Sequence, residues 1–183
     1  MKINAMKNNS KLRTKKIVIC LLLSLLLIPI TGCSPNILIK SDEQIAANFI
    51  RLLGYTIVSY DGESPKYTLD RELLKNLGEF KLWGVQKTKP EQYIGKEIHT
   101  FKFTVTNHPL QKIFSHDLYD ILVTVMIVDH NVIGGTSLPN YTVVKTVMAG
   151  GVFSIQGKDT DKIKGMSYDE WLDYWKENFG FKD

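Results

Sequence analysis

The sequence YDILVTVMIV, residues 119–128, is apolar on both faces after Asp120. A strand with one wet face alternates apolar and polar side chains, so this run predicts a central strand of a sheet that is covered on both faces. Residues 98–107 do alternate, with threonine or lysine at every second position, and predict a half-buried strand. Residues 141–148 and 152–155 predict a further pair of strands, joined as a hairpin by a turn at 149–151.

Two capping boxes predict helices on either side of these strands. Ser41-Asp42-Glu43-Gln44 opens a run with helical apolar spacing that ends at Gly54, and Ser167-Tyr168-Asp169-Glu170 opens an amphipathic helix near the end of the chain. After the first helix we expect a short strand at 55–60 closed by a turn at 61–62. A short helix at 69–77 and an irregular stretch should follow.

The order of these elements predicts an α+β fold. We expect an antiparallel sheet of about four to six strands, with helices packed on one face and at the C-terminus. Cystatin-like and NTF2-like domains have this layout, as an analogy of shape only. Nothing in the composition marks a second domain, so residues 41–183 are predicted to form a single globular domain.

The positive charge of the chain is concentrated at its start. The 183 residues have a formal net charge of +4, but six of the 23 basic residues lie in the first 16 positions, and no acidic residue precedes Asp42. After residue 32 there remain 17 basic and 19 acidic residues, a net charge of −2. A slightly acidic domain gains little from phosphate contacts, so we expect no nucleic-acid partner.

The basic start is followed by an apolar run at residues 17–30, interrupted only by Ser24. These 14 residues are too few for a membrane-spanning helix, which needs about 20, and suit the apolar core of a signal peptide, which needs about 7–15. Residues 1–32 are therefore predicted to be a removable signal peptide. The alternative is an uncleaved amino-terminal anchor.

The junction Ile30-Thr31-Gly32-Cys33 resembles the lipobox of bacterial lipoproteins. The resemblance implies cleavage between Gly32 and Cys33 and attachment of lipid to the Cys33 thiol, with residues 33–40 as a lipidated tether. Two or more acyl chains anchor a protein stably, whereas one chain is marginal. The expected location is the extracytoplasmic face of the cell membrane, with the membrane itself as a partner. Because Cys20 lies in the leader, no disulfide is expected in the mature protein.

A second resemblance covers the residues between Leu52 and Ser137. Its motifs are Gly54-Tyr55, Gln86-Lys87, Tyr93-Ile94-Gly95-Lys96, Val105-Thr106-Asn107-His108-Pro109 and Val132-Ile133-Gly134-Gly135. Their order resembles an uncharacterised domain of secreted proteins and lipoproteins from low-GC Gram-positive bacteria. An aspartate follows the paired glycines in that domain, where this chain has Thr136. The resemblance implies one compact exported domain and no particular substrate.

Four histidines are present: His99, His108, His116 and His130. None of their spacings matches a zinc site, in which two ligands lie close together on one element. His116-Asp117 and Asp129-His130 flank the strand at 119–128, which separates them by about 30 Å at roughly 3.3 Å per residue. These side chains are predicted to be polar residues at strand ends and turns.

The remaining short motifs also favour structural roles. The sequence Gly134-Gly135-Thr136-Ser137 lacks the Gly-x-Ser-x-Gly pattern of a nucleophile and predicts a bulge or turn. Asp159-Thr160-Asp161 lacks the later ligands of a calcium loop and predicts a solvated loop. Aromatic residues near the C-terminus are expected in the core: Tyr168, Trp171, Trp175, Phe179 and Phe181. The sequence predicts no catalytic residue, no metal site and no cofactor.

Three functional hypotheses follow. The first is a non-enzymatic binding or accessory module at the cell envelope, whose partner is an envelope protein, a peptide or a glycan. The second is an envelope hydrolase or transferase in which folding pairs one of the histidines with Asp117, Asp120 or Asp129. The third is a structural or regulatory component of an envelope complex.

Overall fold

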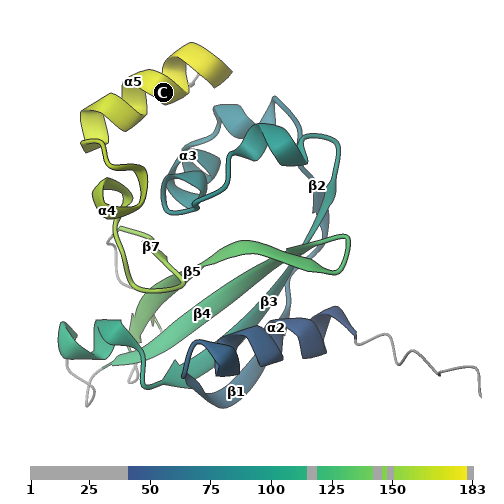
Figure 1. Cartoon of the computed structure of the whole chain (residues 1–183), viewed down its shortest axis with the longest axis vertical. Helices are drawn as coiled ribbons and strands as arrows, with labels where there is room; N and C mark the ends of the chain where they lie inside the picture. The colour runs from purple at the N-terminus through teal and green to yellow at the C-terminus, as the bar shows by residue number, and fades with distance from the viewer. Residues whose placement is uncertain (1–40, 115–118, 142–145, 148–150, 181–183) are drawn as a thin grey trace, which may run out of the picture. The chain divides into compact units, whose positions relative to one another are not determined.

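A computed structural model describes residues 41–114, 119–141, 146–147 and 151–180, within a compact unit that spans Ile39–Asp183. The main path of the sheet runs β1 (Thr56–Glu63), β3 (Glu97–Thr106), β4 (Tyr119–Val128), β5 (Asn131–Tyr141) and β6 (Thr146–Val147). Two short strands lie off this path: β2 (Tyr67–Thr68) pairs with β3, and β7 (Phe153–Ser154) pairs with β5. All of these pairings are antiparallel, so the α+β fold is confirmed (Figure 1).

The helices are α2 (Asp42–Leu52), α3 (Leu77–Gly84), α4 (Thr160–Lys164) and α5 (Tyr168–Phe179). Three 3-10 turns accompany them: η1 (Leu73–Lys75), η2 (Pro90–Tyr93) and η3 (Pro109–Lys112). Both predicted capping boxes are confirmed at Ser41 and Ser167. In the part of the chain that is described, no helix has the length and apolar character needed to cross a bilayer.

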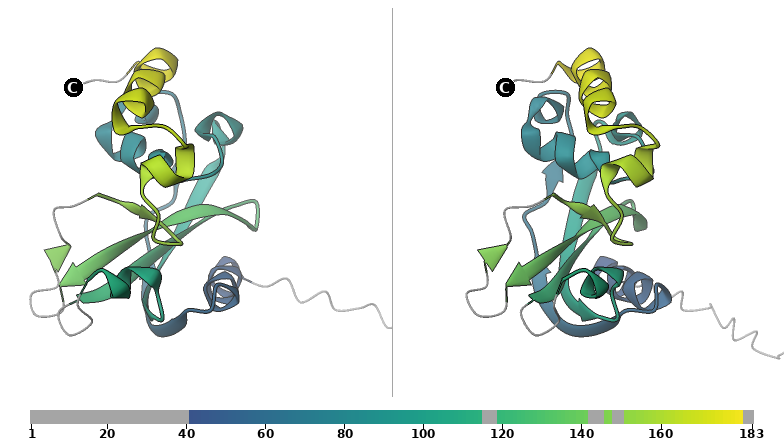
Figure 2. Two further views of the ribbon diagram at one scale, coloured as in Figure 1. Left: turned by 60° about the vertical axis from the view of Figure 1, so that its left-hand side comes forward. Right: turned by 90° about the vertical axis from the view of Figure 1, so that its left-hand side faces the viewer.

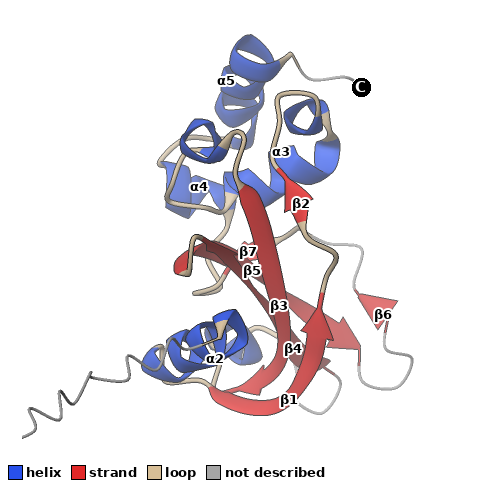
Figure 3. Ribbon diagram, turned by 90° about the vertical axis from the view of Figure 1, so that its right-hand side faces the viewer, coloured by secondary structure: helices blue, strands red, loops and turns tan. Residues whose placement is uncertain are grey.

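The predicted central strand is confirmed as β4, which pairs with β3 on one side and with β5 on the other. Its side chains alternate between two cores. Val125 and Ile127 belong to the core that α2 covers, whereas Met126 and Val128 belong to the core formed with α3 and α5. Successive strand residues point to opposite faces, so the end of β4 is buried on both. Figures 1 and 3 show α2 on one side of the sheet, and α3, α4 and α5 gathered on the other side.

The core under α2 is aliphatic and aromatic. Ala46 and Ile50, one turn apart on the helix, are fully buried against side chains of β3 and β4 such as Phe103 and Val123. At roughly 25 cal/mol per Å² of apolar area, burial of this face stabilises α2 far more than its helix propensity does.

The second core is built from tryptophans. Trp175 is fully buried and donates its Nε1–H to the Leu74 carbonyl at 2.7 Å, while Trp171 donates to the Phe80 carbonyl at 3.3 Å. The prediction of core packing is thereby confirmed for both residues and for Phe179. Tyr168 is instead 51% exposed, and Phe181 lies outside the described residues.

Several local predictions are wrong. In the described residues β6 and β7 each pair with β5, and not with one another as a hairpin. Residues 61–62 do not end the strand, because β1 continues through a bulge to Glu63. The helix expected at 69–77 begins only at Leu77, where burial of Phe80 and Trp83 outweighs the low helix propensity of two glycines. Asp159 is the N-cap of α4, with its side chain accepting from the Lys162 N–H, and not a solvated loop residue.

Candidate functional site

A groove of about 230 Å³ lies between three segments of the domain. Its walls are residues 85–88 after α3, residues 132–135 of β5 and residues 154–156 at the end of β7, and Phe49 and Ile163 complete the lining. Figure 2 shows β5 and the segment that leads from β7 to α4 from two further sides. Lys87 is the only ionisable residue among those that line the groove. The lining is otherwise apolar, apart from amide and hydroxyl groups.

The Gln86 side chain fixes one wall of this groove to the other. Its Oε1 accepts the Gly135 N–H at 2.8 Å, and its Nε2 donates to the Gly135 carbonyl at 3.0 Å and to the Leu82 carbonyl at 2.8 Å. The amide therefore pairs with Gly135 as the backbone of a neighbouring strand would. Gln86 is only 2% exposed, so its removal would leave a buried N–H unpaired, a loss worth about 1–3 kcal/mol.

Both glycines of β5 are required by this close packing. A Cβ on Gly134 would lie 2.1 Å from the Gln86 Oε1, and a Cβ on Gly135 would lie 2.0 Å from the Thr124 carbonyl oxygen. Their φ angles of +156° and +155° are also rarely adopted by other residues. The predicted bulge is confirmed here, because the pairing of β4 with β5 shifts register beside Ile133.

Ile155 forms the floor of the groove, and two side-chain hydrogen bonds to its carbonyl hold it in place. The Tyr55 hydroxyl donates to it at 3.1 Å, and the His108 Nε2 lies 2.8 Å from it. The His108 Nδ1 accepts the Leu110 N–H at 3.1 Å, so the ring is satisfied as a neutral imidazole with its proton on Nε2. Burial lowers the pKa of His108. This histidine supports the structure and is not free to act on a ligand.

Lys164 lies directly behind the Gln86 wall. Its Nζ donates to the Gln86 carbonyl at 2.7 Å and is 4.5 Å from the centroid of the Trp171 ring. Burial is the main reason that the pKa of this amine is lowered from 10.5 to about 8. Among the described residues no carboxylate forms an ion pair with it. Glu91 favours the charged form of this amine without forming an ion pair with it, and no sequence pattern singled out Lys164.

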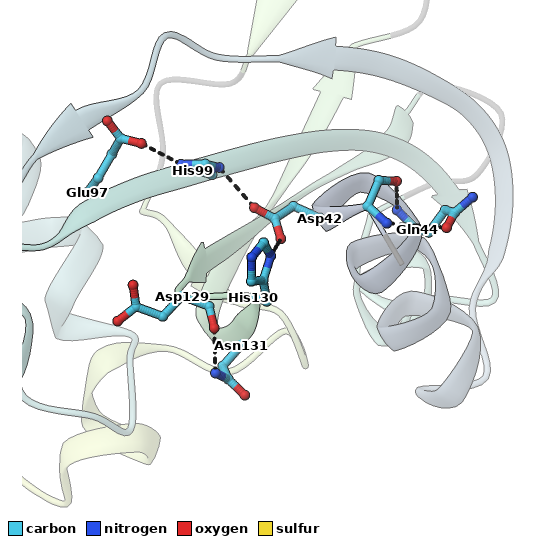
Figure 4. A network of polar contacts seen from close by, with 8 residues as sticks. Asp42, Gln44, Glu97, His99, Asp129, His130 and Asn131 are labelled. Atoms are coloured by element: carbon cyan, nitrogen blue, oxygen red, sulfur yellow. Dashed lines mark hydrogen bonds and ion pairs between the residues drawn. The ribbon is translucent and has the colours of Figure 1, made fainter. Parts of the chain in front are cut away.

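A second polar cluster lies at the start of α2 (Figure 4). The Asp42 Oδ1 is 2.7 Å from the His130 Nδ1, and its Oδ2 is 3.0 Å from the His99 Nδ1. The other ring nitrogen of His99 is 2.7 Å from the Glu97 Oε1. Asp42 and His99 are largely shielded, with side chains 14% and 19% exposed, whereas the His130 side chain is 68% exposed. One carboxylate thus joins the first turn of α2 to β3 and to the turn between β4 and β5.

That turn holds His130 in place at a cost in backbone energy. Asp129 and His130 have φ angles of +48° and +60°, which are the positive values of a type I′ hairpin turn. Left-handed backbone costs roughly 1–2 kcal/mol at a residue other than glycine. Lys96 stabilises the turn from outside, with its Nζ 2.9 Å from the Asp129 Oδ2.

The structure pairs a histidine with an aspartate, but not with one proposed from the sequence. The partner of His130 is Asp42, 88 positions away, whereas Asp129 binds Lys96 and Asp120 lies opposite Asn140 in the sheet. No sequence pattern indicated the long-range pairing. The other predicted site residues lie outside the described residues: Gly32, Cys33, His116 and Asp117.

The cluster contains no further catalytic or metal-binding partner in the described part of the chain. Neither imidazole there forms a hydrogen bond with a serine, threonine or cysteine. No three histidine, cysteine, aspartate or glutamate side chains among these residues are placed to hold a metal ion. Without a nucleophile in contact, the Asp42–His130 pair is half of a catalytic arrangement.

Comparison of the chain with protein families, curated proteins and solved structures finds no match.

Proposed function

We propose that this protein is a lipid-anchored binding module of the extracytoplasmic membrane face, held by lipid on Cys33, whose binding site is the groove beside Gln86. The observation that carries the proposal is the nature of the groove. It is concave and mostly apolar, and its single ionisable residue, Lys87, has no acid or base beside it in the lining. Such a lining suits the holding of a ligand and lacks the paired groups of acid–base catalysis.

The walls of the groove support this proposal because they are fixed before any ligand arrives. Gln86 ties one wall to β5, and Tyr55 and His108 tie the floor to the sheet. A preformed site loses less conformational entropy on binding than a flexible one. Gln86, Gly134 and Gly135, which belong to motifs of the exported-domain resemblance, line this groove, and Tyr55 and His108 of the same motifs contact its Ile155 carbonyl.

Two experiments test the two halves of the proposal. Labelled palmitate should be incorporated into the parent protein in cells and not into Cys33→Ala, and equal labelling of both would contradict the lipid anchor. A photo-crosslinking amino acid at position 87 should capture a defined envelope component in intact cells, whereas one at the exposed position 66 should not. Equal capture from both positions, or from neither, would contradict the groove as the binding site.

The Asp42–His130 pair supports a second candidate function, an envelope hydrolase or transferase. The His130 side chain is exposed while its Nδ1 is oriented by a carboxylate, which is the geometry of a general base. Activity-based probes should then label the protein, with labelling lost in His130→Ala and retained in Lys66→Ala. Labelling that is absent, or that does not depend on His130, would eliminate this candidate.

A further inference from the structure

The size of the groove limits its occupant. At about 30 Å³ per water, 230 Å³ corresponds to roughly eight waters, and it falls below the ~300–1,000 Å³ of pockets that enclose drug-sized ligands. The groove therefore has room for one amino-acid side chain and its backbone.

The lining selects an apolar side chain. Phe49, Val132, Ile133 and Ile163 line the groove and are each partly exposed, so they provide apolar surface that a ligand would cover. Two polar side chains of the lining are already engaged: the Gln86 amide with Gly135, and the Thr88 hydroxyl with the Ile133 carbonyl. A sugar would find few free hydrogen-bonding partners here, whereas a leucine-like or phenylalanine-like side chain would displace water from apolar surface.

Basic and acidic residues both lie around the groove, but the only ionisable residue in its lining is a lysine. Lys87 lines the groove, and Lys89 and Lys158 are exposed close to its walls along the chain. None of these three forms an ion pair among the described residues. Lys164 adds a half-buried ammonium group behind the Gln86 carbonyl; it forms no ion pair among the described residues, and Glu91 favours its charged form. An anionic ligand would pair with Lys87, which has no group of opposite charge in the lining of the groove.

We propose that the groove binds the C-terminal residue of a peptide or protein, with its apolar side chain among Phe49, Val132 and Ile133 and its carboxylate at Lys87, within the field of Lys164. This inference rests on the proposed function and names the chemistry of the ligand. A chain end combines one side chain with one full negative charge, which is the combination that the size, lining and charge of the groove select. Lys164 acts through its charge and is a positioning residue. Burial lowers the pKa of Lys164 to about 8, and a bound carboxylate would raise it again, because an opposite charge favours the charged amine.

Four probes test the proposal in equilibrium binding measurements on the lipidated full-length protein in detergent micelles. They are the acetylated peptide Gly-Gly-Ser-Leu with a free carboxylate, the same peptide with a C-terminal amide, the free-acid peptide ending in aspartate, and dodecanoate. The first should bind, and the other two peptides should each bind at least tenfold more weakly. The amide loses a charge-assisted hydrogen bond, which is worth a factor of about ten or more. The aspartate peptide keeps its carboxylate but places a charged side chain against apolar surface. Lys87→Met should weaken the leucine peptide by a similar factor, while Lys66→Met should leave it unchanged.

Lys164→Met separates a positioning role from a structural one. The variant should weaken the free-acid peptide and leave the weak affinity of the amide unchanged, whereas a merely structural change would weaken both alike. Thermal unfolding shows whether each variant is folded. If Lys164→Met does not fold, Lys87→Met still tests the proposal, because Lys87 is exposed and its replacement should not disturb the fold.

The remaining outcomes distinguish the two proposals. Equal binding of acid and amide, with loss in a groove-filling variant such as Thr88→Trp, would overturn the carboxylate inference and leave the binding module standing. Binding of dodecanoate alone would also overturn the inference, in favour of a lipid ligand. If no probe binds and no crosslink forms at position 87, both the inference and the proposed function fail.

Discussion

Substitution of Gly135 by alanine tests the packing that shapes the groove. The new Cβ would lie 2.0 Å from the Thr124 carbonyl oxygen and 2.5 Å from the Ile155 Cδ1. The first of these atoms is backbone of the central strand, so relief of the contact requires β5 to move away from β4 by more than 1 Å, given ordinary contacts of about 3.5 Å. Such a movement breaks ladder hydrogen bonds and the pairing of Gly135 with Gln86.

The size of the effect follows from two costs. Overpacking of a filled interior costs about 1–3 kcal/mol, and a φ near +155° at a residue with a side chain adds about 1–3 kcal/mol. We therefore expect Gly135→Ala to lower the free energy of unfolding by about 4 kcal/mol. For a domain of this length the loss corresponds to a fall in Tm on the order of 10 °C.

Urea unfolding followed by tryptophan fluorescence measures this loss, and Gly78→Ala is the matched control. A Cβ on Gly78 meets nothing within 4 Å, and the residue lies in the first turn of α3, so alanine there should stabilise the protein by up to about 1 kcal/mol. Gly134→Ala should fall between the two, because its Cβ meets the end of the Gln86 side chain and not backbone. A Gly135→Ala protein within 1 kcal/mol of the parent would refute the packing argument.

Three further predictions concern charged and titratable groups. Burial lowers the pKa of His108 below its ordinary value of 6.5. As the pH falls below 6.5 the unfolded chain takes up a proton at this histidine before the folded protein does, so the free energy of unfolding should decrease. His108→Asn should be less stable than the parent at pH 7, and its stability should depend less on pH in this range. Lys164→Met should lower the Tm at pH 7 by less than about 5 °C, because loss of the hydrogen bond to the Gln86 carbonyl is offset by removal of a half-buried ammonium group; a larger fall would contradict this. Asp42→Asn should lower the free energy of unfolding, measured in urea, by about 1–2 kcal/mol, because it weakens two imidazole contacts and removes a favourable charge at the helix N-terminus. Glu43→Gln, in the same first turn, should lower it by less than about 0.5 kcal/mol. Equal losses would show that the imidazole contacts contribute nothing.

The parts of the fold that were predictable depend on local rules. The apolar sequence of β4 indicates burial on both faces, and the side chains at the end of this strand do belong to two different cores. The capping boxes at Ser41 and Ser167 involve only four consecutive residues each, so they can be read from the sequence. Helix α3 was missed because its two glycines oppose a helix locally, and only tertiary burial of Phe80 and Trp83 compensates. The pairing of β6 and β7 with β5 likewise depends on a distant strand.

The candidate site was less accessible to sequence reasoning. The residues Gln86 and Gly134-Gly135 belong to recognisable motifs, but no pattern indicates that an amide side chain will take the place of a strand against Gly135. No local pattern distinguishes Lys164 from the other lysines, because its burial and its hydrogen bond to the Gln86 carbonyl depend on the tertiary fold. The contact of Asp42 with His130 spans 88 positions and arises from the packing of α2 on the sheet.

The position of the bound ligand tests directly whether the groove is the binding site. Amide chemical-shift changes should be followed by NMR as the acetylated free-acid peptide Gly-Gly-Ser-Leu is added to the ¹⁵N-labelled mature protein. The largest changes are expected at the backbone amides of Gly134 and Gly135 and at the Gln86 side-chain amide, with little change at His99 and His130. Changes centred on the two histidines, or no changes at all, would contradict the groove as the functional site.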